Sequence, residues 1–275
     1  MREKLFALKN MLIADWAAFN WSQFKPFTFA ELTSSLTGKE RKLELTLAFI
    51  ASIILFFILF VDEPLAHYVK TLDPGVSEFF GSITEIGSSA WLIICSLGLI
   101  LACLIGCSFA RHKKTKYAFT LIRQWSWYFL AVVALLGLSV NLVKYMLGRA
   151  RPKYLEELGA LEFEFFIFES GFASFPSGHT TTAISAAVAL GIIFPRLKVY
   201  FITIGLWVGL SRVMVGAHYI SDITAGFVYG TVGAWIFYHY FLHQSFFKAP
   251  TKKRRRIIYA TCINCLRQIA HSNKN

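Results

Sequence analysis

A histidine and an aspartate stand four residues apart, at His218 and Asp222, shortly after the basic residue Arg212. Residues at this spacing are neighbours on one face of a helix, so we expect the two side chains to meet. A carboxylate that accepts a hydrogen bond from one imidazole nitrogen fixes the tautomer and leaves the other nitrogen free for attack or proton transfer. A lone histidine near a membrane interface is more often structural. The nearby aspartate and arginine favour nucleophilic chemistry on an anion instead.

A second histidine, His179, follows a sequence that is typical of a helix start. Pro176 suits the first turn of a helix, and the hydroxyl of Ser174 or Ser177 is suited to cap it. The unpaired N–H groups and the positive dipole end of such a helix favour a bound anion. Gly178 lets the backbone approach that anion closely, which places His179 beside it. Taken alone, the same residues are also compatible with an ordinary helix start.

Several cations stand at the end of an apolar segment, in the stretch from Lys144 to Pro152. Lys144 and Arg151 are seven residues apart, about two helical turns, and would project on one side of a continuing helix. Gly148 and Pro152 indicate that the helix ends here. A specific anion explains these cations; the alternative is that they snorkel to the lipid headgroups. Arg149 lies outside the seven-residue spacing, and we interpret it as a candidate headgroup contact.

The elements that position these groups are those of a membrane protein. The chain has 275 residues, of which 56% are hydrophobic and 16% are charged, whereas soluble domains carry about 25% charged residues. A spanning helix needs roughly 20 mostly apolar residues. We therefore predict an all-α fold, a six-span transmembrane helix bundle, with spans at about 43–61, 89–110, 121–146, 176–194, 199–215 and 220–242.

The sequence divides into three parts. Residues 1–40 mix basic and large apolar side chains, which suits an N-terminal interfacial helical segment on the membrane surface; a loosely ordered tail is the alternative. Residues 41–245 form the six-helix transmembrane domain, and residues 246–275 form a basic cytoplasmic tail. No short apolar run with a small-residue cleavage site precedes the first span, so a removable signal peptide is not expected.

Lys and Arg gather in alternate connections, at 111–116, 196–198 and 252–256, whereas the predicted loop at 62–88 is mainly acidic. The positive-inside tendency places both termini in the cytoplasm. The histidines and the cations near them then face the non-cytoplasmic side of the membrane. This orientation, together with contact to anionic lipids, explains much of the net charge of +12. Nucleic acid is therefore not an expected partner.

Metal chemistry has little support in the sequence, because neither a P-loop nor an HExxH motif occurs. The acidic stretch from Glu156 to Glu169 is interleaved with Leu and Phe, which is typical of a surface or substrate-entry loop. Cys262 and Cys265 have C-x-x-C spacing, but no second pair follows, so a zinc or redox role is the weaker interpretation. We expect chemistry without a metal or a cofactor.

Three motifs occur in order along the chain: K-x6-R-P from Lys144 to Pro152, P-S-G-H from Pro176 to His179, and S-R-x5-H-x3-D from Ser211 to Asp222. Each motif is weak alone. Together, on predicted membrane helices, they make the chain resemble the type 2 phosphatidic acid phosphatase family over about residues 43–242. The resemblance implies a helical six-span fold and a phosphohistidine intermediate.

The resemblance also implies a role for each matching residue. His218 attacks phosphorus and Asp222 orients it, while His179 protonates the leaving oxygen and later helps to activate water. The phosphoryl oxygens are held by Lys144, Arg151, Ser177, Gly178 and Arg212.

Bacterial members of this family act on phosphatidylglycerol phosphate, phosphatidic acid, undecaprenyl pyrophosphate or lipid A phosphates. The motifs bind the phosphate that these lipids share, so they do not choose among them. We expect a lipid phosphatase of envelope biogenesis in a bacterial inner membrane, with its site facing the periplasm. Its partners are a phosphorylated lipid and the bilayer. Two alternatives remain open: a phosphotransferase that moves phosphate between lipids, and a non-catalytic phosphate-lipid binder or transporter. The oligomeric state is not predicted.

Overall fold

The computed structural model describes residue 11, residues 40–244 and residues 247–272. In this part of the chain the regular elements are helices, and the strand-like pairing is confined to one isolated bridge between Arg149 and Phe163. The predicted all-α membrane fold is confirmed. The predicted interfacial segment falls on residues 1–40, which lie almost entirely outside the described residues, so it stays a prediction.

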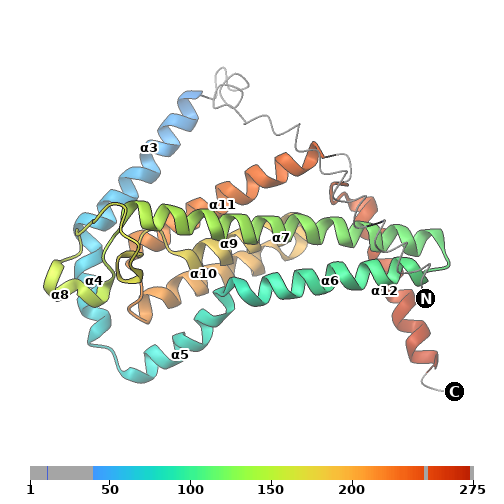
Figure 1. The fold of residues 1–275 in the computed structure, drawn as a ribbon, viewed down its shortest axis with the longest axis horizontal. Coiled ribbons are helices and arrows are strands. Elements are labelled where there is room, and N and C mark those ends of the chain that lie inside the picture. The colour runs from blue at the N-terminus through green and yellow to red at the C-terminus, as the bar shows by residue number, and fades with distance from the viewer. Residues whose placement is uncertain (1–10, 12–39, 245–246, 273–275) are drawn as a thin grey trace.

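The helix bundle is built around α7 (Lys113–Leu147) and α9 (Gly178–Ile193). The helices α6 (Ser89–Phe109), α10 (Lys198–Met214) and α11 (Ile220–Leu242) lie along them, as Figure 1 shows. Apolar side chains fill the interior, including Leu121, Val132, Val133, Ala189 and Ala234, all fully buried. Large apolar side chains also cover the outside, such as Ile94, Leu138 and Leu142, each more than 60% exposed. An apolar exterior over buried helices is what a bilayer requires.

Within the described ranges, five helical segments are long and apolar enough to cross a membrane: Glu44–Lys70, Pro74–Phe109, Lys113–Leu147, Pro195–Met214 and Ile220–Leu242. The remaining predicted span, 176–194, corresponds to α9, an apolar helix of 16 residues, which is shorter than the roughly 20 residues that a spanning helix needs. It is bounded by the cap at Ser177 and by the Pro195 turn. The helix exists as predicted, but the count of six spans stays a prediction.

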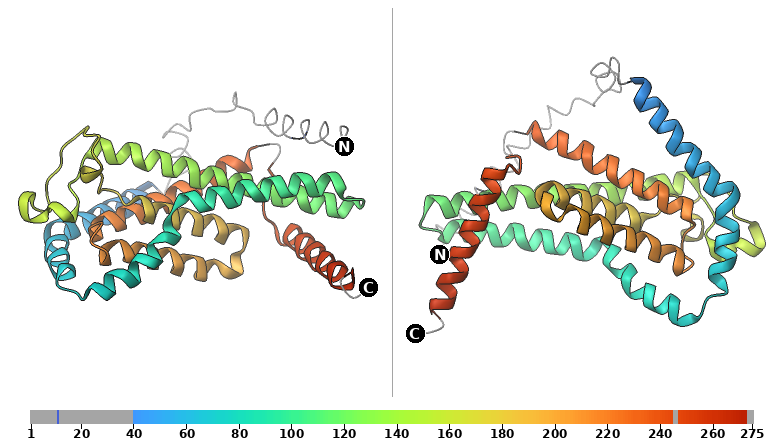
Figure 2. Two further views of the ribbon diagram at one scale, coloured as in Figure 1. Left: turned by 60° about the horizontal axis from the view of Figure 1, so that its bottom comes forward. Right: turned by 180° about the vertical axis from the view of Figure 1, so that it is seen from behind.

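The segment 62–88 differs from the loop that the sequence predicts, because it is mostly helical. The helix α3 (Glu40–Phe56) continues through a π-helical turn, η2 (Phe57–Val61), into α4 (Asp62–Lys70). The next helix, α5 (Pro74–Thr84), begins with a proline, and the Asp73 side chain accepts a hydrogen bond from Gly75 N at 2.7 Å. Of the acidic residues in this segment, Glu63, Asp73, Glu78 and Glu85 are exposed, whereas Asp62 is buried. The helix α5 packs against α10 (Figure 2).

The predicted basic tail contains a helix, α12 (Lys252–Ser272). It lies at the end of the bundle opposite α4 and α8 (Leu155–Leu158), as Figure 1 shows. Trp125 Nε1 donates to the Lys248 carbonyl at 2.8 Å, which ties the segment before α12 to α7. The side chains of Cys262 and Cys265 lie outside the described residues.

Candidate functional site

His218 lies in the turn between α10 and α11, and only 2% of its surface is exposed. Gly216 adopts a positive φ of 66° in this turn, a conformation that glycine reaches without strain. The backbone N–H of His218 donates to the Arg212 carbonyl at 3.2 Å, which fixes the turn to the end of α10. The sequence predicted that His218 and Asp222 share a helix face, but α11 begins at Ile220, so the turn brings them together. Their Nδ1 and Oδ2 atoms are 3.4 Å apart.

Asp222 is fully buried and is surrounded by hydrogen-bond donors. Its Oδ2 accepts from the Ser174 hydroxyl at 2.6 Å and from Tyr219 N at 2.9 Å, besides facing His218. Its Oδ1 accepts from Arg149 Nη1 at 2.7 Å. These contacts leave the carboxylate a single orientation, in which it faces Nδ1 of the imidazole. The other ring nitrogen, Nε2, is then free to act as a nucleophile.

The start of α9 places His179 near Lys144 and Arg151, the same cations that interact with His218. Ser177 is the N-cap of this helix, as predicted, with its Oγ accepting from Thr180 N at 3.5 Å and from Thr180 Oγ1 at 2.9 Å. Ser177 N donates to the Asp222 carbonyl at 2.9 Å, which fixes the start of α9 against the start of α11. A Cβ on Gly226 would lie 2.7 Å from the Ser177 carbonyl oxygen, so this close approach requires glycine.

Three basic side chains converge on His179 from three different elements. Lys144, in the last turn of α7, donates to the Ala173 carbonyl at 3.1 Å, and its Nζ would lie 3.5 Å from a Cβ on Gly178. Arg212, near the end of α10, donates from Nη1 to Thr84 Oγ1 at 2.7 Å. Arg151 follows α7, and all three cations interact electrostatically with His179. Such a concentration of buried positive charge calls for an anion.

Two of these guanidinium groups retain hydrogen-bonding capacity. Within the described part of the chain, Nε of Arg151 and Nε of Arg212 are buried and have no hydrogen-bond partner. An unsatisfied buried N–H is costly, and the acceptor oxygens of a phosphate would satisfy both. The structure therefore brings together every residue that the sequence singled out for phosphate chemistry.

The sequence analysis interpreted Arg149 as a headgroup contact, and the structure shows that this interpretation is wrong. Its side chain is fully buried and forms salt bridges with Asp222 at 2.7 Å and with Asp62 at 2.8 Å. The two carboxylates raise the pKa of Arg149 against the effect of burial. A position near a helix end is compatible with either snorkelling or burial of the Arg149 side chain. The salt bridges with two buried carboxylates stabilise the buried position.

Sequence reasoning missed Asp62 as a site residue and named Ser174 only as a helix cap. Asp62 interrupts an apolar spanning segment, and an ionisable residue in such a place is a functional candidate by default. That signal could have found it. No comparable signal marks Ser174, whose hydroxyl reaches an aspartate 48 residues away.

The acidic loop after α8 presents aromatic side chains to the outside. Phe165, Phe166 and Phe168 are each more than 60% exposed. The loop is fixed to the end of α7, because Glu164 N donates to the Gly148 carbonyl at 2.8 Å. A Cβ on Gly148 would collide with the Glu164 carbonyl oxygen, so this contact requires glycine. Its place beside the site is compatible with the predicted entry role.

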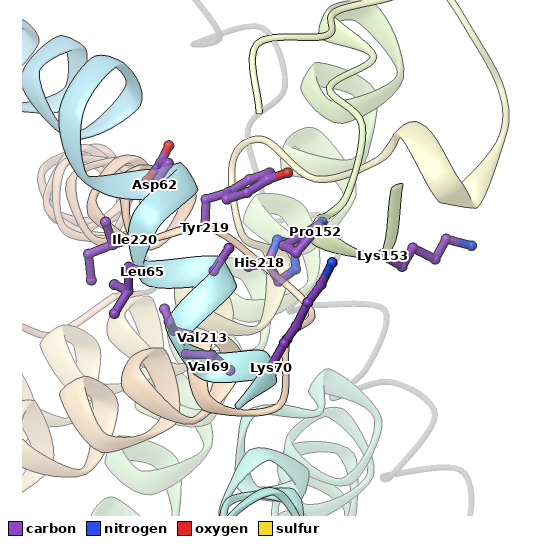
Figure 3. Close-up of a pocket in the computed structure, with 12 residues that line it drawn as sticks. Asp62, Leu65, Val69, Lys70, Pro152, Lys153, Val213, His218, Tyr219 and Ile220 are labelled. Atoms are coloured by element: carbon purple, nitrogen blue, oxygen red, sulfur yellow. The ribbon is translucent and has the colours of Figure 1, made fainter. Parts of the chain in front are cut away.

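A cavity of about 80 Å³ lies between α4 and the turn that holds His218. In Figure 3, α4 carries Asp62, Leu65, Val69 and Lys70 past this turn. The cavity has room for water but not for a lipid headgroup. Among the described residues, no group of three His, Cys, Asp or Glu side chains is arranged to hold a metal ion.

Burial lowers the pKa of His218 to about 3, because the desolvated site disfavours the imidazolium, while the hydrogen bond to Asp222 opposes the shift. The folded-state pKa then lies below the unfolded value of about 6.5. The contribution of His218 to the free energy of unfolding is fully present above about pH 6.5. It is lost as the pH falls towards 3, because the unfolded chain binds the proton first.

We therefore expect the titration of His218 to lower the free energy of unfolding by on the order of 2 kcal/mol when the pH falls from 7 to 5. Melting temperatures of the detergent-solubilised protein at the two pH values measure this loss. His218→Asn should show a smaller fall than the wild type, whereas His239→Asn, which removes an exposed histidine of α11, should match the wild type. Equal falls in the wild type and His218→Asn would contradict a buried neutral imidazole.

Several known proteins have sequences that are similar to this chain. The PAP2 superfamily model matches residues 125–246. A lipid A 1-phosphatase of Rhizobium etli is 38% identical over 155 residues, covering 56% of this chain and 67% of that protein. A lipid A 1-phosphatase of Rhizobium johnstonii is 37% identical, covering 67% of this chain and 73% of that protein. Phosphatidylglycerophosphatase B of Bacillus subtilis is 27% identical, covering 65% and 88%. The resemblance drawn from the three motifs is confirmed: this chain belongs to the type 2 phosphatidic acid phosphatase (PAP2) family, a family of membrane lipid phosphate hydrolases.

Proposed function

We propose that this chain hydrolyses the phosphate ester of an envelope lipid through a phosphohistidine on His218, and that the substrate is the 1-phosphate of lipid A. The observation that carries the reaction is the buried His218–Asp222 pair, which shares the nearby cations Lys144 and Arg151 with His179. The choice of lipid is supported by the two lipid A 1-phosphatases that share 37–38% identity with this chain.

The first step forms the covalent intermediate. Nε2 of the neutral His218 attacks phosphorus and the bond to the lipid oxygen breaks. His179, which takes up a proton when the negative charge of the bound phosphate offsets the surrounding cations, gives that proton to the lipid oxygen. The Nδ1–H of His218 donates to Asp222, which stabilises the positive charge that develops on the imidazole. Lys144, Arg151 and the other groups of the anion site hold the equatorial oxygens, whose charge increases in the transition state.

The second step releases phosphate. His179, now unprotonated, accepts a proton from water, the water oxygen attacks phosphorus, and the bond to His218 Nε2 breaks. Each histidine returns to its starting state, so one lipid phosphate and one water give one lipid alcohol and one inorganic phosphate. The same intermediate would give phosphotransfer if a second lipid hydroxyl replaced water.

We also propose that both termini face the cytoplasm and that the site faces the periplasm. The support is the distribution of charge, because the basic helix α12 lies at the end of the bundle opposite α4 and α8. The connection 111–116 before α7 is also basic. Both patterns follow the positive-inside tendency.

The proposal is tested with a panel of detergent-solubilised lipid phosphates: lipid A, phosphatidylglycerol phosphate, phosphatidic acid and undecaprenyl pyrophosphate. We expect free phosphate from lipid A, and from its 1-position, at a rate that is at least about tenfold that of the other lipids. The rate should not change with a chelator present. Rapid release from another lipid would contradict the lipid A assignment alone. A phosphorylated second lipid without free phosphate would show phosphotransfer instead of hydrolysis.

A further inference from the structure

Arg149 is bound through all of its donor groups. Its Nε and Nη2 donate to the Ala160 carbonyl at 3.3 and 2.8 Å, and its Nη1 donates to Ser221 Oγ at 2.7 Å. The remaining two donors reach the carboxylates of Asp222 and Asp62. A guanidinium has five N–H groups in a planar fork, so nothing is left with which this side chain could bind substrate.

Asp62, in the first membrane-spanning segment, binds both Arg149 and Ser221. Its Oδ1 accepts from Ser221 N at 3.0 Å, and its Oδ2 accepts from the Ser221 hydroxyl and from Arg149 Nη2. Asp62 is 1% exposed, and Arg149 lies 87 residues away in the sequence. The first residue of α4 is thereby joined to the first turn of α11, which carries Asp222.

Negative and positive charges alternate along this series of contacts. Asp62 is negative, Arg149 is positive and Asp222 is negative, with the neutral His218 at the end. Removing one partner of a buried ion pair leaves an uncompensated charge, which is strongly unfavourable. Without Asp62, Arg149 would retain Asp222 as its carboxylate partner among the described residues, and would draw that carboxylate away from Nδ1 of His218.

We propose that Asp62 and Arg149 are positioning residues for the nucleophile: Arg149 orients Asp222, and Asp62 balances the charge of Arg149, so that Asp222 stays available to His218. This inference rests on the proposed function of His218. The inference extends that proposed function, because it assigns a positioning role to the first spanning segment, which contributes none of the three motifs.

The test compares Asp62→Asn with the wild type, using the full chain in detergent micelles and lipid A as the substrate. We expect kcat to fall by about 10- to 100-fold, the range seen when a group that supports a functional side chain is removed. KM should stay within about twofold, because Asp62 does not reach the phosphate site. Glu63→Gln is the matched control, since it removes the neighbouring carboxylate, which is exposed, and should leave both constants unchanged.

A double-mutant cycle separates positioning from general stability. If Asp62 acts through Asp222, Asp62→Asn should change the rate by less than about twofold when Asp222→Asn is already present. Equal fold losses in the two backgrounds would show that Asp62 acts independently of Asp222, and would overturn the inference. An Asp62→Asn variant with wild-type kcat would overturn it too.

Ser221→Ala replaces Asp62→Asn if that variant does not fold. It removes the hydroxyl that joins Asp62 to Arg149 and keeps all three charges, so kcat should again fall while KM holds. An unchanged kcat in a folded Ser221→Ala would count against the inference. A wild-type protein that hydrolyses no lipid phosphate would overturn the proposed function and this inference together, whereas an active wild type with unaffected variants would overturn the inference alone.

Discussion

Replacing His218 by alanine is expected to lower kcat/KM for the lipid substrate by about 10⁴-fold or more, because loss of a catalytic nucleophile removes the covalent route altogether. The imidazole is 2% exposed and is held against Asp222, which orients its ring. Phosphate release from lipid A under saturating and limiting substrate measures both constants. His239→Ala, on the exposed side of α11, is the control and should keep wild-type activity.

The same pair of variants tests whether the intermediate exists. With radiolabelled lipid phosphate, rapid quenching at alkaline pH should trap acid-labile phosphate on the wild type and on His239→Ala, and none on His218→Ala. A labelled His218→Ala protein would place the nucleophile elsewhere. Full activity in that variant would sink the assignment of His218 altogether.

Replacing His179 by asparagine is expected to slow the reaction of the lipid by about 10²- to 10⁴-fold, the usual contribution of general acid–base catalysis. A lipid alkoxide is a poor leaving group and needs the proton that His179 supplies. A nitrophenolate leaves without one. Formation of the phosphoenzyme from p-nitrophenyl phosphate should therefore slow by less than about tenfold in the variant.

His179 also serves as the base that activates water, so hydrolysis of the intermediate should slow with either substrate. For His179→Asn with p-nitrophenyl phosphate we expect a burst of nitrophenol that matches the enzyme concentration, followed by slow turnover and accumulation of phosphohistidine. Stopped-flow absorbance and rapid quenching measure the two steps. Equal slowing of phosphoenzyme formation with both substrates would show that His179 is not the general acid.

Local spacing made much of the site predictable. The cap at Ser177 and the start of α9 follow from a proline, two serines and a glycine within five residues, and such signals act within one helical turn. His218 and Asp222 were paired correctly, although the turn that unites them was predicted as helix. The end of α7 was also predictable, since Gly148 caps it in a left-handed conformation.

Other features depend on contacts between distant segments. The sequence predicted a loop at 62–88, where the structure has α4 and α5, because charged residues on a helix surface and in a loop look alike. Arg149 was interpreted as a headgroup contact. Its buried position depends on the contact with Asp62, which lies 87 residues away in the sequence and is not visible in the local pattern. A cation near a helix end has two low-energy environments, and the local sequence does not distinguish them.

By itself, then, the sequence determined the class of fold and the family, and it indicated the groups that we propose bind the phosphate, because apolar runs and short motifs act over a few residues. The tertiary structure decided how the nucleophile is supported. Asp222 receives donors from Ser174 and Arg149, and Arg149 receives Asp62 from the first span. Buried polar groups must find partners, and which partners they find depends on how the helices pack.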